Sequence, residues 1–222
     1  MTTHHIKKSG IDRTNSSARF VLASGRPMAW RGIDLITAAM LAVAFGVVFW
    51  AFDTFVYPGV GVVTAAFPPA AELALGVWLI PAVVGGLVVR RPGAAVLTEV
   101  IAASVELFLG NQWGVAVLLS GTLQALGVEL VLAMLLWRRF GVVIAALGGL
   151  LSAAMEITGY EWWSYVAGYS WTWKLVYLAC GMVSGGLIAG VGGWALVRAL
   201  ARSGALNAFP AGQEVHEADA LR

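Results

Sequence analysis

The chain has 222 residues, of which 59% are hydrophobic and only 12% are charged, with a formal net charge of +2. This charged fraction is about half that of an average soluble domain, and together with the mean hydropathy of +0.82 it excludes a soluble globular protein. The single cysteine, Cys180, excludes a disulfide framework and a cysteine-based metal site.

The chain begins with a polar stretch, and we expect residues 1–28 to form a cytoplasmic tail without a signal peptide. A helix needs about 20 apolar residues to cross the roughly 30 Å hydrocarbon layer of a bilayer. Six segments within residues 29–200 qualify, which predicts an all-α integral membrane domain of six transmembrane helices. The segments are 33–52, 71–89, 94–109, 115–137, 142–162 and 175–197.

The distribution of basic residues supports this count. Thirteen of the fourteen lysines and arginines lie before span one, after span six, or in the loops that join spans two to three and four to five. Because basic loops favour the cytoplasmic side, both termini are expected to be cytoplasmic. A seventh span through residues 53–70 would break the alternation, and its glycines and prolines favour an external loop or a re-entrant segment.

Beyond the last span, residues 201–222 include Glu214, Glu217 and Asp219 and are expected to form a second polar, solvated tail. The sequence contains no glycine-rich phosphate-binding loop, which argues against an ATPase activity of its own. It also shows no inverted repeat of the kind found in secondary transporters.

Carboxylates within or at the edges of the spans are the feature that needs explanation. An ionised side chain at a helix centre costs about 2.5–3.5 kcal/mol, so these groups must face the bundle interior or water. No lysine or arginine lies at mid-depth, and the residues therefore predict a site whose counter-charge comes from a ligand. The set is Glu72, Glu99, Glu106, Glu129, Glu156 and Glu161, with the neutral Gln124.

Helical spacing divides this set by depth. Glu99 and Glu106 are seven residues apart and share one helix face, with Glu99 about 10 Å deeper and assigned to the cytoplasmic half. The external half is predicted to gather Glu72, Glu106, Asn111, Gln124 and Glu161.

Two other pairs are five residues apart, which is about 140° around an α-helix. Gln124 and Glu129 are therefore not expected to face one site, and the same holds for Glu156 and Glu161. For Glu99, Glu129 and Glu156, interhelical hydrogen bonding and ligand contact both stay open.

Tryptophans and tyrosines also gather on the external side. Most fit an interfacial belt, while one or two would stack on a flat cationic ligand. The group is Trp113, Trp162, Trp163, Tyr165, Tyr169, Trp171 and Trp173.

Small residues recur every fourth position in the first span, at Ala38, Ala42 and Gly46. Such stripes let helices approach closely in lipid. The stripe serves either packing within the bundle or docking of another membrane subunit.

The stretch "RRPGAAVLTEVIAASVELFLGN", followed by "QALGVELV", resembles the YkoE family. Its members are substrate-binding membrane subunits (S components) of energy-coupling factor (ECF) transporters, associated with thiamine and its hydroxymethylpyrimidine precursor. The resemblance is close over residues 71–131 and looser over spans one, five and six. It implies an S-component bundle in a bacterial plasma membrane, with a transmembrane coupling (T) subunit and two ATPase subunits as partners.

The resemblance further implies a non-catalytic subunit that binds a vitamin in its external half, without cofactor, metal or nucleic acid. The residues carried over are Glu72, Glu106, Asn111, Gln124 and Glu161, with Trp113 and Tyr165 as aromatic contacts. The docking strip would be Ala38, Ala42 and Gly46, of which the third departs from the family's alanine.

Two other classes of function remain for comparison. A proton- or cation-coupled transporter of a small amine would use the carboxylates as a relay, but the absence of a repeat disfavours it. A membrane enzyme would need histidine, serine or aspartate groups in the spans, and all three histidines lie in the tails.

Overall fold

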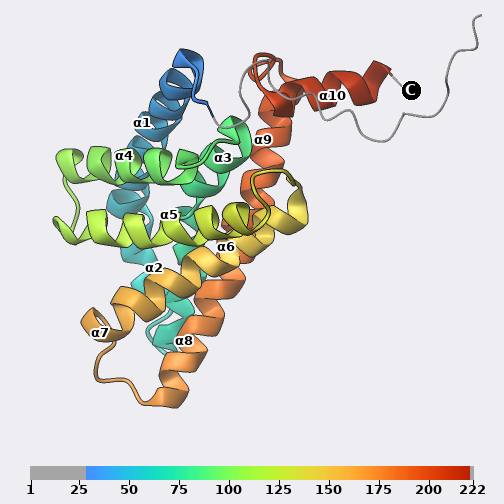
Figure 1. Cartoon of the computed structure of the whole chain (residues 1–222). Coiled ribbons are helices and arrows are strands. Elements are labelled where there is room, and N and C mark those ends of the chain that lie inside the picture. Colours follow the sequence, from blue (N-terminus) through green and yellow to red (C-terminus); the bar gives the residue numbers. More distant parts are fainter. Residues whose placement is uncertain (1–28, 221–222) are drawn as a thin grey trace, which may run out of the picture.

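The computed structural model describes residues 29–220, and every regular element in that part of the chain is a helix (Figure 1). The helices pack into one bundle, in which α4 and α5 run side by side. In chain order the elements are α1 (Gly32–Phe55), α2 (Tyr57–Val63), η1 (Pro68–Val77), α3 (Ile80–Val89), α4 (Ala94–Leu109), α5 (Ala116–Met134), α6 (Val142–Glu156), η2 (Ile157–Glu161), α7 (Trp162–Ser164), α8 (Trp171–Ser184), η3 (Gly185–Gly192), α9 (Gly193–Arg202) and α10 (Pro210–Ala220).

Five continuous helical segments are long and apolar enough to cross a membrane, and they correspond to five of the six predicted spans. The sixth is α4, which has the predicted bounds but only 16 residues. It is shorter than the roughly 20 residues of a typical span, and it packs against α1, α3 and α5. The stretch expected to be an external loop or re-entrant segment contains the short helix α2.

The second span is not a continuous α-helix. Its outer part, η1, is a 3₁₀-helix that starts with two prolines, and α3 begins after a break at Trp78 and Leu79. The Ser184 hydroxyl fixes η1 by donating to the Leu73 carbonyl at 2.7 Å and accepting from the Gly76 amide at 2.9 Å. This tighter helix places Glu72 toward the interior of the bundle, where its side chain is buried.

The small-residue stripe of α1 faces α4 rather than an outer surface. Ala38, Ala42 and Gly46 are buried in the bundle, and a Cβ at Gly46 would lie 2.7 Å from the Ala102 carbonyl oxygen. Because α4 covers the stripe in this structure, its use as a partner-docking strip stays a prediction. The small size of these residues lets α1 and α4 pack backbone to backbone.

Two spans contain a π-helical segment, η2 in the fifth span and η3 in the sixth. A π-turn makes i→i+5 hydrogen bonds and so accommodates one extra residue per turn. In η2 this wider turn brings Glu156 and Glu161 to the same side of the helix, although they are five residues apart. The expectation that these two residues cannot face one site is therefore wrong.

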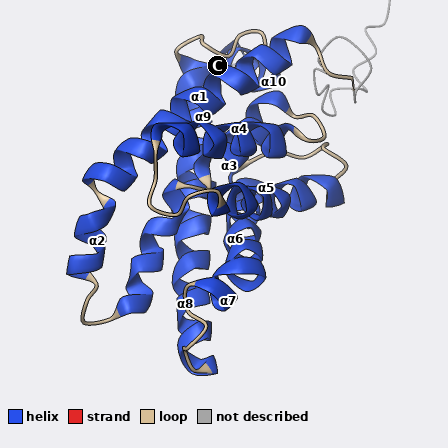
Figure 2. Cartoon of the chain, turned by 90° about the vertical axis from the view of Figure 1, so that its left-hand side faces the viewer, coloured by secondary structure: helices blue, strands red, loops and turns tan. Residues whose placement is uncertain are grey.

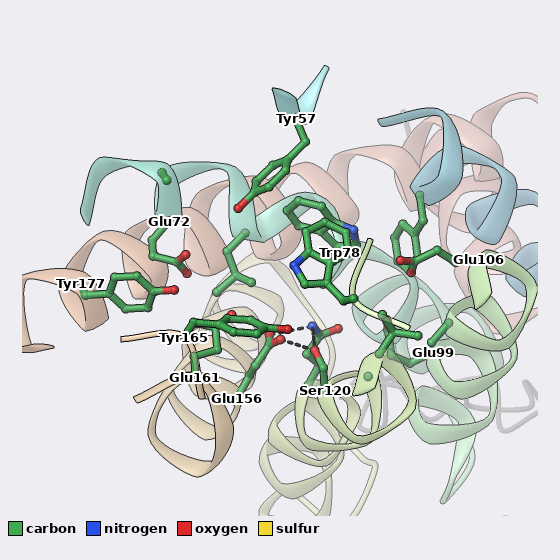
Figure 3. A pocket seen from close by; sticks show the side chains of 18 residues that line it. Tyr57, Glu72, Trp78, Glu99, Glu106, Ser120, Glu156, Glu161, Tyr165 and Tyr177 are labelled. Carbon is green, nitrogen blue, oxygen red and sulfur yellow. Dashed lines mark hydrogen bonds between the residues drawn. The ribbon is translucent and has the colours of Figure 1, made fainter. Parts of the chain in front are cut away.

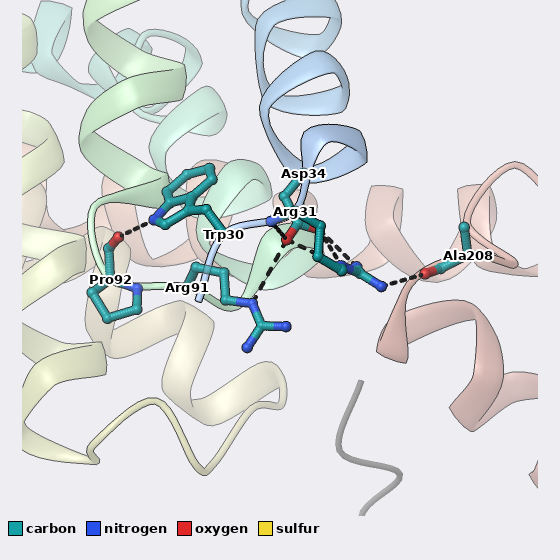
Figure 4. A network of polar contacts seen from close by, with 6 residues as sticks. All are labelled: Trp30, Arg31, Asp34, Arg91, Pro92 and Ala208. Carbon is teal, nitrogen blue, oxygen red and sulfur yellow. Dashed lines mark hydrogen bonds and ion pairs between the residues drawn. The ribbon is translucent and has the colours of Figure 1, made fainter. Parts of the chain in front are cut away.

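The basic loops and both described ends of the chain meet at one end of the bundle. Asp34 on α1 is fully buried there, where it pairs with Arg31 at 2.6 Å and with Arg91 at 3.7 Å. The Trp30 indole donates to the Pro92 carbonyl at 3.1 Å, which ties the start of α1 to the α3–α4 turn (Figure 4).

The C-terminal segment differs from the solvated tail that we expected. Helix α10 lies across this same end, beside the ends of α3 and α9 (Figure 2). Arg90 pairs with Glu214 on α10, with the second contact of the pair at 2.9 Å. The apolar side chains that pack this segment against the bundle core are Leu206, Phe209, Ala211 and Val215. Four apolar side chains in a short polar segment did not distinguish it from a solvated tail.

Candidate functional site

A cavity of about 280 Å³ lies inside the bundle and receives side chains from nearly every span (Figure 3). Its two ends are acidic and its middle is bounded by aromatic rings. The residues that line it are Phe49, Tyr57, Ala71, Glu72, Leu75, Trp78, Glu99, Ala103, Glu106, Trp113, Val117, Ser120, Gly121, Gln124, Glu156, Glu161, Tyr165 and Tyr177.

One end of the cavity is built from Glu72 on η1 and Glu161 on η2. The two carboxyl groups interact with each other and with the hydroxyl of Tyr177 on α8. Each retains one buried oxygen, Oε2, without a hydrogen-bond partner among the described residues. A buried acceptor left open in this way is costly unless a ligand or water fills it.

Glu156 lies next to this end, and both of its oxygens are occupied. The Ser120 hydroxyl donates to Oε1, and the Gln124 amide donates to Oε2 at 2.6 Å. Ser152 donates to the Gln124 carbonyl at 2.7 Å and so holds the α5 and α6 backbones together at this point. Glu156 therefore joins α5 to α6 and gives this wall of the cavity a carboxyl group that is held in place.

The opposite end contains Glu99 and Glu106 from one face of α4, as their spacing predicted. Glu106 lies against Asp53 at the end of α1, and Asp53 also accepts a hydrogen bond from the Trp78 indole at 3.1 Å. Glu99 is fully buried, and its Oε2 accepts from the Ala82 amide at 2.8 Å. Glu99, which the spacing assigns to the cytoplasmic half, lines the same cavity as Glu106.

Three aromatic rings form a mutual edge-to-face cluster along the cavity. The Tyr57 and Trp78 ring centroids are 5.2 Å apart, those of Tyr57 and Trp113 are 5.4 Å apart, and those of Trp78 and Trp113 are 5.6 Å apart. Such a cluster offers ring faces on which a flat cation can stack. Burial and the carboxylates Glu72, Glu161 and Asp53 raise the pKa of Tyr57 to about 12, so its hydroxyl stays uncharged at neutral pH.

Of the seven residues predicted to bind a ligand, six line this cavity: Glu72, Glu106, Trp113, Gln124, Glu161 and Tyr165. The seventh, Asn111, lies outside the lining. Its Oδ1 accepts from the amides of Trp113 and Gly114 at 2.8 and 2.6 Å, so it shapes the loop that presents Trp113.

Glu129, whose role the sequence left open, also lies outside the cavity. It accepts from the Gly93 and Ala95 amides at 2.6 and 3.2 Å and from the Trp137 indole at 3.1 Å. It therefore caps the start of α4. Most of the outer aromatics lie elsewhere too, and two of them, Trp163 and Trp171, flank the Lys174 ammonium.

Several residues that line the cavity could not be assigned to the site from the sequence. Tyr57 and Trp78 lie in the loop-like stretch and at the break in span two, where no helical period places them. Ser120 and Tyr177 carry no distinctive pattern. The sequence feature that does indicate the site is the presence of carboxylates in apolar spans, because Glu99 and Glu156 each need a polar partner there.

A cavity of this kind can bind a cationic or amine-bearing molecule through carboxylates and aromatic rings, which fits a substrate-binding membrane component of a transporter. Known proteins agree with this class. Residues 33–155 match the family model described as ABC-type cobalt transport system, permease component. A crystal structure of an S-component of an ECF transporter superposes with a TM-score of 0.79 at 32% identity, covering 86% of this chain and 95% of that one.

Among sequences, the HMP/thiamine permease protein YkoE of Bacillus subtilis (strain 168) is 33% identical over 187 residues, which is 84% of this chain and 92% of that protein. The chain therefore belongs to the YkoE family of S components, the non-catalytic, multi-pass membrane subunits that bind substrate for ECF transporters. The S-component fold implies association with T and ATPase components.

Proposed function

We propose that this protein is the thiamine-binding subunit of an ATP-driven vitamin importer in a bacterial plasma membrane. It would bind thiamine from outside, in the external half of the bundle. A T subunit and two ATPase subunits would then supply the energy for transport. The YkoE relative, named for both hydroxymethylpyrimidine (HMP) and thiamine, supports this ligand class.

The observation that carries the proposal is the presence of two acidic ends separated by aromatic rings. Glu72 and Glu161 form one end, and Glu99 and Glu106 form the other. Thiamine joins an aminopyrimidine, which offers N–H donors, to a thiazolium cation. A two-ring ligand of this kind can engage both ends at once, whereas HMP alone would engage one. This favours thiamine over its precursor.

The test is calorimetric binding of thiamine and HMP to the purified full-length protein in detergent. Glu72→Gln and Glu106→Gln each remove a charge from one end, and Glu129→Gln is a matched control outside the cavity. Loss of a hydrogen bond to a charged group corresponds to about a tenfold or larger loss of affinity. We expect each cavity variant to weaken thiamine by that amount and the control to leave it unchanged.

The outcomes separate the alternatives. Tighter binding of HMP than of thiamine would assign the precursor as substrate. Binding of neither compound to the folded wild-type protein would reject the proposal.

A further inference from the structure

Glu99 is held differently from the other carboxylates of the cavity. Its Oε2 accepts from the Ala82 amide, which lies in the first turn of α3. Amides in a first turn have no acceptor within their own helix, and they form the positive end of the helix dipole. The start of α3, created by the break in span two, therefore stabilises a negative charge on Glu99 within the bundle.

The other oxygen of Glu99 is open to the cavity. Oε1 is buried and has no hydrogen-bond partner among the described residues. Gly121 on α5 faces it, and a Cβ at this position would lie only 3.9 Å from Oε1 and 3.1 Å from the Ala103 Cβ. The glycine thus leaves room in front of the carboxylate. The structure gives Glu99 one oxygen for the protein and one for whatever enters the cavity.

The other lining carboxylates lack this combination. Glu156 has both oxygens engaged by Ser120 and Gln124, and Glu106 lies against a second acid, Asp53. Glu72 and Glu161 interact with each other. Among the described carboxylates of the cavity, Glu99 alone pairs a helix N-terminus with an open oxygen. A carboxyl group buried beside a neutral amide is costly to ionise, and a positive charge on the ligand would offset that cost.

We propose that Glu99 makes the cavity select a cationic ligand over an uncharged one of the same shape. The inference deepens the proposed function and rests on it, because it assigns the positively charged ring of thiamine to the end of the cavity formed by α4. It also gives Glu99 a dual role, since the same side chain fixes the start of α3.

The test compares thiamine with an uncharged analogue in which a thiophene replaces the thiazolium ring. Affinities of both are measured for the wild type, Glu99→Gln and Glu129→Gln. The glutamine can still accept from Ala82 through its amide oxygen, so the fold should be retained. Glu129 also caps a helix start, but it does so outside the cavity, and its variant therefore controls for the loss of a capping charge.

We expect Glu99→Gln to weaken thiamine by about 10- to 100-fold and the uncharged analogue by less than about threefold. Glu129→Gln should leave the ratio of the two affinities unchanged. Equal losses for both ligands, or no loss for thiamine, would overturn the inference while leaving the proposed function intact. If Glu99→Gln does not fold, Glu99→Ala decides, because it also removes the carboxylate, and an unchanged affinity ratio in that variant would also overturn the inference.

A wild type that binds neither compound would reject the proposed function first. Simple aromatic cations, such as N-methylated pyridinium ions, would then replace thiamine in the same comparison with uncharged rings. A wild type that binds none of these cations would reject the role of Glu99 as well.

Discussion

At the scale of single residues, the cavity depends on glycine as much as on glutamate. Gly121 leaves space in front of the Glu99 carboxylate on α4, and a side chain at position 121 would enter the cavity. Residues of this kind contribute no polar contact of their own. They decide how much of a buried carboxylate a ligand can reach.

Substituting Gly121→Ala should therefore weaken thiamine binding by about tenfold or more, because overpacking at such a site costs about 1–3 kcal/mol. Calorimetry in detergent measures the effect. Gly59→Ala is the matched control, since a Cβ at Gly59 would meet no atom within 4 Å. Equal affinities of the Gly121→Ala variant and the wild type would contradict this account of the cavity.

Residue types indicated the site better than helical geometry did. Carboxylates in apolar spans pointed to the cavity because they need partners, and this holds for Glu72, Glu106 and Glu161 whatever the details of the helix. The sequence could not predict that Asn111 lies outside the cavity lining. Its side chain turns back and accepts hydrogen bonds from two amides of its own loop. Local hydrogen bonds of this kind cannot be predicted from the periodicity of hydrophobic residues.

At the scale of elements, the π-helical turn η2 sets which side chains of the fifth span face the cavity. Regular α-helical geometry separates Glu156 from Glu161 by about 140°, and only the wider turn brings them together. The sequence predicts the fifth span but not the π-helical turn η2. No residue pattern in the span distinguishes the five π-helical residues from α-helical ones.

Inserting one alanine after Gly159 in η2 should turn the following residues of the span by about 100°. Glu161 would then leave the cavity, and thiamine affinity should fall by at least about tenfold. The thermal midpoint of unfolding in detergent reports whether the bundle is preserved. Unchanged affinity in a folded insertion variant would show that the turn does not position Glu161 for the ligand.

The contact between α1 and α4 is a second property of elements. Gly46→Ala places a Cβ 2.5 Å from the Cβ of Val105, and we expect it to lower the free energy of unfolding by about 1–3 kcal/mol. Gly32→Ala, at the start of the same helix, meets nothing within 4 Å and serves as the control. Denaturant unfolding in detergent micelles compares the two. Similar stabilities would mean that the helices separate easily at this point.

At the scale of the whole molecule, the C-terminal helix α10 packs on the bundle without contributing a residue to the cavity lining. Val215 of α10 is buried in the core cluster, whereas Ala218, three residues later, is exposed. Val215→Asp should lower stability by about 1–3 kcal/mol through an unpaired buried charge. Ala218→Asp adds the same charge without this cost, and thermal unfolding measures both.

Thiamine affinity of folded Val215→Asp protein should stay within about threefold of the wild type, because the cavity lies away from α10. A large loss of affinity would show instead that the cavity and α10 are coupled.

The six-helix membrane architecture could be predicted because apolar length and loop charge follow directly from the bilayer. The packing of α10 could not, because four apolar side chains in a short polar segment carry no such constraint. The role of Ala38, Ala42 and Gly46 stayed open at the level of sequence for a related reason. A stripe of small residues indicates close approach, but it does not say which helix approaches.

The Ser184 hydroxyl has a further consequence for how the protein is made. It fixes η1 through Gly76, a residue that lies 108 positions earlier in the chain. Synthesis proceeds from the N-terminus, so the second span reaches the membrane long before the serine that holds its 3₁₀ part. Glu72 can take its final place only after the last span has been inserted. A chain still attached to the ribosome should therefore be unable to bind the vitamin, and binding competence would mark the completion of biogenesis.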